Sequence, residues 1–308
     1  MQIGRYKEEL PMIELRTNRL WVQIPEPGEH PNTTLRFDRA GFISQVILDG
    51  IHSFCTTEPE FPGLPHTGGA GLCSEIACST DGEAAIGEYF PKFGVGMLQK
   101  TDNEPYNFRK HYAVQFLQTE IFSKEDEQTV IFENHMAPCQ GYQLKERKTV
   151  KADENSITVF YEMENRGKKE LSLREYCHNF ISIDYYPLGP EYTLKMPVVP
   201  QNEKKPERGT GTIQGTDCGF SFTGYADTAC AVRINSDEIL PGEFYWKLSH
   251  SGGMAAVEER VSFKPSWILV WSVDNNISPE VSYCFTLPPG KAISYWRRWT
   301  FTDSLFQP

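Results

Sequence analysis

Residues 151–184 read KADENSITVFYEMENRGKKELSLREYCHNFISID. Within this stretch, residues 156–163 place Ile, Val and Tyr at alternate positions, with a more polar opposite face. A period of two is typical of a β-strand with one buried face, whereas an amphipathic helix has a period near 3.6. The Arg-Gly pair at 166–167 then supplies a turn signal. The stretch therefore predicts β-strands separated by short turns.

The same period recurs along the chain, at residues 113–121 and 128–133. The run WILVW at 267–271 is continuously apolar, as expected of a strand that is covered on both faces. Turn signals rich in Gly and Pro separate these runs, and no long amphipathic helix is evident. We predict an all-β protein, a large antiparallel β-sandwich that forms a single domain over residues 1–308.

The composition of the chain excludes several classes of binding partner. The chain has 308 residues and a net charge of −11, and an acidic surface repels phosphate backbones, which argues against nucleic acid. No stretch of 18 uncharged apolar residues occurs, so no transmembrane helix is expected. The start MQIGRYKEELP lacks the features of a signal peptide, and we expect eight reduced, mostly buried cysteines in a cytoplasmic protein. No Cys or His spacing is typical of zinc, so no metal and no other cofactor is predicted.

Aromatic residues make up 13% of the chain. Aromatic side chains fill a sandwich efficiently, and they also present flat faces to the apolar face of a sugar ring. A concave sheet lined with aromatic and polar side chains would suit a small carbohydrate. Composition therefore offers a carbohydrate ligand as one interpretation.

Two adjacent strands resemble the middle of the aldose 1-epimerase (galactose mutarotase) superfamily. Residues 161–167, YEMENRG, are similar to its pattern Y-x-V-x-N-x-G, and residues 176–180, YCHNF, are similar to the histidine-bearing strand that follows.

Further matches follow in the family's order. Residues 268–271, ILVW, resemble a strand that ends in Ile-Trp; residues 277–280, ISPE, resemble the strand C-I-E-P; and residues 287–290, LPPG, resemble L-x-P-G. Residues 90–94, FPKFG, resemble the turn P-R-H-G. Order and spacing extend the resemblance over most of the chain.

The resemblance implies a β-supersandwich with an open, concave sugar site. It also implies mutarotation: a base removes the proton of the anomeric hydroxyl while an acid protonates the ring oxygen, and no cofactor is needed. The candidate acid is His178, and the candidate base is Glu280. The alternatives are a core histidine bonded to the backbone and a glutamate in a surface turn. As catalysts, the two should share one cleft without direct contact, separated by a sugar-sized gap.

One landmark departs from the pattern. Phe93 stands where the family carries a sugar-contacting histidine, which leaves open whether catalysis is retained. Lys92 replaces the preceding arginine and is a candidate sugar contact. The family's early arginine has no clear counterpart. The glycine-rich residues 61–75 fill that region instead, and His66 and Glu75 within them are candidate sugar contacts.

Two aromatic residues complete the predicted site. Tyr176 shares a strand face with His178, and Trp271 offers a stacking platform. Glu175 lies on the opposite face and is expected to be solvated. Arg297-Arg298 is the only arginine doublet, and alternation makes it a poor phosphate clamp.

The sequence thus predicts an aldose 1-epimerase-type isomerase acting on a free sugar or sugar derivative. The alternatives are a non-catalytic carbohydrate-binding protein on the same fold, and a structural sandwich without a sugar site. A small-molecule carbohydrate is the expected partner, and the oligomeric state is left open.

Overall fold

The computed structural model describes residues 12–29, 35–123 and 127–303. In these residues nearly all regular structure is strand, and the two helical segments are single 3₁₀ turns, η1 (Asp81–Glu83) and η2 (Ser236–Glu238). The all-β prediction is confirmed, and the turn signals fall between strands as expected. The prediction of a single domain stays a prediction.

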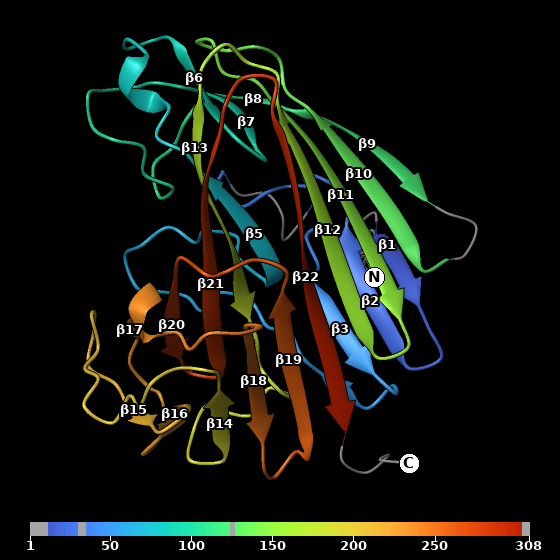
Figure 1. Ribbon diagram of the computed structural model, residues 1–308, viewed down its shortest axis with the longest axis vertical. Helices are drawn as coiled ribbons and strands as arrows, with labels where there is room; N and C mark the ends of the chain where they lie inside the picture. Colours follow the sequence, from blue (N-terminus) through green and yellow to red (C-terminus); the bar gives the residue numbers. More distant parts are fainter. Residues whose placement is uncertain (1–11, 30–34, 124–126, 304–308) are drawn as a thin grey trace, which may run out of the picture.

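The largest layer is a ten-stranded antiparallel sheet that curves across the molecule (Figure 1). Its strands, in spatial order, are β15 (Ile213–Thr216), β16 (Gly219–Phe222), β14 (Tyr192–Lys195), β18 (Tyr245–His250), β19 (Ala255–Val261), β22 (Ala292–Asp303), β12 (Ser156–Asn165), β11 (Leu144–Asp153), β10 (Thr129–His135) and β9 (Gln118–Ser123).

Two smaller sheets lie behind this layer in Figure 1. The first has the order β17 (Cys230–Asn235), β20 (Trp267–Val273), β21 (Asn276–Leu287), β13 (Leu171–Phe180) and β5 (Gly71–Ala77). The second has the order β1 (Met12–Arg16), β2 (Leu20–Pro25), β3 (Gln45–Leu48) and β4 (His52–Ser53). A small sheet of β6 (Tyr89–Lys92), β7 (Gly96–Gln99) and β8 (Val114–Phe116) lies at one end of the molecule.

Alternation explains the main core. In β12, Ile157, Val159 and Tyr161 are at most 3% exposed and point between the layers, while Phe160 is exposed on the outer face. The predicted apolar strand behaves differently: Ile268 and Val270 of β20 are fully buried, but Trp267 and Trp271 are half-buried on the other face. That second face of the five-stranded sheet is therefore not covered by core.

Polar groups also bridge the layers. Arg297 of β22 is fully buried, and it hydrogen bonds Glu175 of β13 (Nη2 to Oε2, 2.6 Å) and Glu259 of β19 (Nη1 to Oε1, 2.9 Å). The expectation of a solvated Glu175 is wrong, although its strand face was predicted correctly. A fully buried Arg297 provides the countercharge that lets this carboxylate face the core.

No disulfide joins any of the eight cysteines, all of which belong to the described residues. Four of them are buried, and Cys218 and Cys284 are exposed. No helix among the described residues is long and apolar enough to cross a membrane.

Candidate active site

A cleft of about 850 Å³ opens over the uncovered face of the five-stranded sheet. All five strands contribute side chains to its floor, and the segment around Tyr106 and Phe108 lines its rim. Because a sheet presents every second residue to one face, each strand gives the cleft alternate positions.

Strand β13 shows this division clearly. Arg174, Tyr176, His178 and Phe180 all line the cleft. The residues between them face the core, as Asn179 shows by accepting a hydrogen bond from the indole Nε1 of Trp299 (3.1 Å).

The two predicted catalytic residues meet on this floor. His178 Nε2 lies 3.3 Å from Glu280 Oε1, and each residue is 5% exposed. The ladder between β13 and β21 runs to the pair Glu175 and Tyr283, and the same count along both strands leads to His178 and Glu280. The two side chains are therefore cross-strand neighbours.

Next to the pair, the backbone ladder is interrupted. Pro279 has no N–H to donate, and the Asn179 N–H instead donates to the side-chain oxygen of Ser278 (2.9 Å), while Asn179 Nδ2 donates to the Pro279 carbonyl (2.8 Å). Side-chain hydrogen bonds thus fix the backbone that carries Glu280.

The direct contact corrects one expectation. We expected a sugar-sized gap between acid and base, and the two groups instead touch. The anomeric oxygen and the ring oxygen of an aldose are both bonded to C1, so groups that serve these two oxygens must lie close together. The two alternatives to these assignments are wrong. Glu280 lies inside a strand and not in a surface turn. Neither ring nitrogen of His178 bonds a backbone atom among the described residues, so His178 is not a core histidine held by the backbone.

Burial sets the charge of this pair. It raises the pKa of the Glu280 carboxyl to about 7, against the opposing effect of the Arg36 charge. Burial and the Arg36 charge both lower the pKa of His178 well below its ordinary value. Its Nδ1 is buried without a hydrogen-bond partner among the described residues. At neutral pH the imidazole is neutral, and Glu280 is poised to gain or lose a proton.

A second carboxylate on the floor, Glu75, is ionised at neutral pH. Glu75 of β5 accepts hydrogen bonds from Lys92 Nζ (2.9 Å), Arg36 Nε (2.9 Å) and the Tyr176 hydroxyl. Burial raises the pKa of Glu75, but the charges of Lys92 and Arg36 outweigh burial and hold the pKa at about 2. Glu75 and Glu280 thus lie in one cleft with pKa values pushed far apart, a pattern typical of catalytic sites.

Arg36 was not predicted from the sequence. Its Nη2 donates to the Tyr176 hydroxyl (3.0 Å), and its guanidinium lies 4.2 Å from the ring centroid of Phe108. The available signal was the segment 35–43, LRFDRAGFI, where charged residues interrupt an otherwise apolar run. Charged residues in such a run must find buried partners.

Of the remaining predicted sugar contacts, Trp271 lies in the cleft and His66 does not. Trp271 lines the cleft, 5.4 Å from His178 between ring centroids. His66 lies outside the cleft lining, and its Nε2 is hydrogen bonded to the Glu58 carbonyl oxygen (2.9 Å). The Gly68 N–H donates to its Nδ1 (2.9 Å), so the glycine-rich loop itself uses both ring nitrogens.

Phe93 does not occupy the position of a sugar contact. It is 1% exposed and packs in the main core, whereas its neighbour Lys92 lines the cleft. Gly94 follows with a φ of +77°, and an added Cβ would lie 2.8 Å from Asp38. Lys92 and Phe93 thus point to different sides, one into the cleft and the other into the core.

A histidine at position 93 should therefore weaken the fold rather than create a sugar contact. We expect Phe93→His to lower the free energy of unfolding by about 2–4 kcal/mol, because it leaves a void and buries a polar ring. Urea denaturation would measure the loss, with Phe93→Leu as an apolar control that costs less. Unchanged stability together with faster anomer exchange would contradict this assignment.

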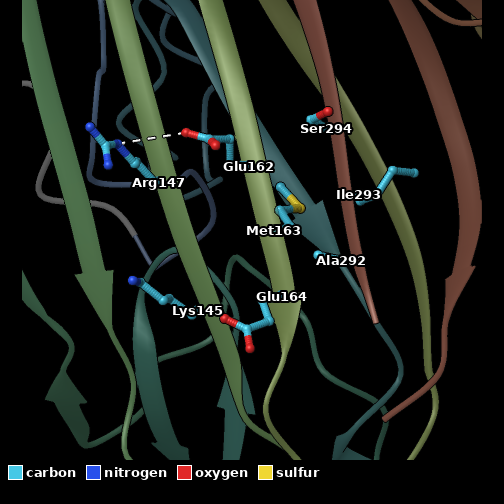
Figure 2. Close-up of a pocket in the computed structure, with 8 residues that line it drawn as sticks. All are labelled: Lys145, Arg147, Glu162, Met163, Glu164, Ala292, Ile293 and Ser294. Carbon is cyan, nitrogen blue, oxygen red and sulfur yellow. Dashed lines mark ion pairs between the residues drawn. The ribbon is translucent and has the colours of Figure 1, made fainter. Parts of the chain in front are cut away.

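Another hollow, of about 390 Å³, lies on the ten-stranded sheet over β11, β12 and β22. Figure 2 shows Lys145, Arg147, Glu162 and Glu164 around it, with Arg147 Nε 3.6 Å from Glu162 Oε2. Both partners of this pair are exposed to solvent, at 42% and 62% of their side chains. Such pairs are typical of a solvated sheet surface and bring no buried acid and base together.

No family model matches the sequence, and none of the curated proteins resembles it detectably. Solved structures do resemble it in fold. A putative aldose 1-epimerase from Escherichia coli is 12% identical, with a TM-score of 0.56 over 96% of this chain and 100% of that one. A galactose mutarotase-like protein from Lactobacillus casei is 12% identical, with a TM-score of 0.54 over 94% and 100%.

A third structure, an aldose epimerase homologue from Caenorhabditis elegans, is 12% identical, with a TM-score of 0.51 over 96% of this chain and 99% of that one. At this identity the likeness concerns the fold. The chain thus has the galactose mutarotase-like fold that its sequence motifs implied.

Proposed function

We propose that this protein is an aldose 1-epimerase-type isomerase that interconverts the anomers of a sugar. The observation that carries the proposal is Glu280, a buried carboxyl with a pKa of about 7 that contacts His178 on the floor of a cleft. A group that titrates near neutral pH is well matched to proton transfer there. The free thiols support a reducing compartment, and we place the protein in the cytoplasm.

In the proposed reaction, the Glu280 carboxylate removes the proton of the anomeric hydroxyl, and the neutral His178 imidazole donates a hydrogen bond to the ring oxygen. The bond between C1 and the ring oxygen breaks, C1 becomes an aldehyde, and the ring oxygen receives the proton that Glu280 has taken. After rotation about the C1–C2 bond, the ring closes on the other face, and Glu280 takes this proton back from the ring oxygen and returns it to the anomeric oxygen. Arg36 holds a fixed positive charge on the same floor, which stabilises negative charge on the reacting oxygens.

A second candidate is a non-catalytic carbohydrate-binding protein. The lowered pKa of His178 favours it, because a neutral imidazole can hydrogen bond a sugar oxygen while little imidazolium is present to act as an acid. Saturation-transfer NMR and exchange NMR on one panel of aldoses separate the candidates. An isomerase accelerates exchange in proportion to protein concentration, whereas a binding protein gives saturation transfer at the background exchange rate.

The pH dependence of exchange tests the role of Glu280. A base must be ionised to act, so the protein-dependent rate should rise with pH and reach half its maximum near pH 7. Exchange NMR from pH 5 to 9, with the buffer rate subtracted at each pH, would measure it. A rate that falls as the pH passes through 7 would make Glu280 the acid instead.

A further inference from the structure

Three arginines line the cleft beyond the catalytic pair: Arg174 of β13, Arg208 of the segment between β14 and β15, and Arg233 of β17. Leu269 pairs with Glu280 on one side and with Arg233 on the other. Arg233 therefore lies two strands from Glu280, about 10 Å between Cα atoms.

The other two arginines lie close to Arg233. The ring of Trp267 links two of them, because its centroid is 4.1 Å from Arg233 Cζ and 5.4 Å from Arg174 Cζ. The backbone of Arg208 forms a β-bridge with Ala231, two residues before Arg233. Three separate segments thus bring guanidinium groups to one side of the cleft.

Two of these arginines have no acceptor within the described part of the chain. Arg233 Nε donates to Glu207 (2.6 Å), but no described carboxylate lies within ion-pair distance of Arg174 or Arg208. The Nε of Arg174 is moreover buried without any hydrogen-bond partner among the described residues. A buried donor without an acceptor is costly, and a guanidinium fork suits a carboxylate or a phosphate.

The cleft's own carboxylates do not fill this role. Glu75 is matched by Lys92 and Arg36, and Glu58 lies 3.6 Å from Arg109. Six Arg and Lys residues and five Asp and Glu residues line the cleft in a chain of net charge −11. The cleft lining therefore has a slight excess of basic residues, whereas the whole protein has an excess of acidic ones.

We propose that the cleft takes an anionic sugar whose phosphate or carboxylate binds Arg174 and Arg208 while its C1 lies against His178 and Glu280. This proposal deepens the function proposed above and rests on it for the position of the ring. Arg174 precedes His178 by four residues on one strand face, about 13 Å between Cα atoms. A hexose with a terminal anionic group, together with the long arginine side chain, spans such a distance.

The test compares glucose, glucose 6-phosphate and glucuronate as ligands of the full chain. We expect both anionic sugars, or one of them, to bind at least tenfold more tightly than glucose by saturation-transfer titration. Arg174→Gln and Arg208→Gln should each weaken anionic binding roughly 10- to 100-fold and leave glucose binding unchanged, since each removes a charged hydrogen-bond donor. The preferred anion identifies the group as phosphate or carboxylate.

Arg298→Gln is the matched control, because Arg298 is exposed on β22 outside the cleft and should change neither affinity. Arg208 is exposed at the cleft, so its variant tests the proposal even if Arg174→Gln fails to fold. Glucose binding as tight as either anion, or equal losses for glucose and the anions in Arg208→Gln, would overturn the proposal.

Exchange NMR on the same ligands separates this inference from the isomerase. Arginine-dependent binding of an anionic sugar without accelerated exchange would support the anionic ligand and refute the isomerase. Accelerated exchange of glucose with no response to the anionic sugars would support the isomerase and refute the anionic ligand.

Discussion

Replacing Glu280 by Gln is expected to slow protein-dependent anomer exchange by roughly two to four orders of magnitude, the usual worth of a positioned general base. Gln keeps the shape of the side chain and can still contact His178, but it cannot accept the anomeric proton. Exchange NMR at several protein concentrations would measure the loss, and saturation transfer should show that the sugar still binds.

The stability of Glu280→Gln as a function of pH provides a control for folding. Burial raises the pKa of Glu280 to about 7 in the folded protein, above its ordinary 4.5, so ionising this group costs folded-state stability as the pH rises from about 4.5 through 7. Glu280→Gln avoids that cost and should be more stable than the wild type above pH 7, by up to about 3 kcal/mol, with no advantage below pH 4. Unaltered exchange in a folded variant would remove Glu280 from the mechanism.

Replacing Arg297 by Met is expected to cost at least about 3–5 kcal/mol of the free energy of unfolding. The guanidinium is fully buried between the carboxylates of Glu175 and Glu259, and its removal leaves both of them buried without their countercharge. Urea denaturation followed by tryptophan fluorescence would measure the change.

The next residue supplies the matched control. Arg298 is exposed, and Arg298→Met should change the free energy of unfolding by no more than about 0.5 kcal/mol. A loss of stability at Arg297 as small as the loss at Arg298 would show that the buried ion pairs contribute little.

The strands were predictable because alternation is a local property. Residues 156–163 show their buried face directly in the order of the side chains, and the structure buries that face. The position of Phe93 was not predictable from motif matching. Lys92 and Phe93 are neighbours, one lining the cleft and the other packed in the core, and the motif alone does not say which of the two enters the cleft.

Alternation predicted the part of the site that one strand carries, whereas Glu280 of β21 was predicted from the family resemblance. Tyr176 and His178 share a face of β13, and the same alternation that placed them also placed Glu175 on the opposite face. The partner of Glu175 was not visible, because Arg297 comes from another sheet. The arginine cluster was not predictable for the same reason: a doublet reports only neighbours in the sequence, whereas Arg174, Arg208 and Arg233 meet through strand pairing.

The two faces of β13 also have consequences for how such a protein can evolve. The cleft-facing residues, such as His178, contact the ligand space, and the intervening residues, such as Glu175, hold the layers together. Substitutions on one face therefore leave the contacts of the other largely intact. Selection can alter the chemistry of the cleft while the scaffold is inherited unchanged, so substrate preference can drift between descendants that keep one architecture.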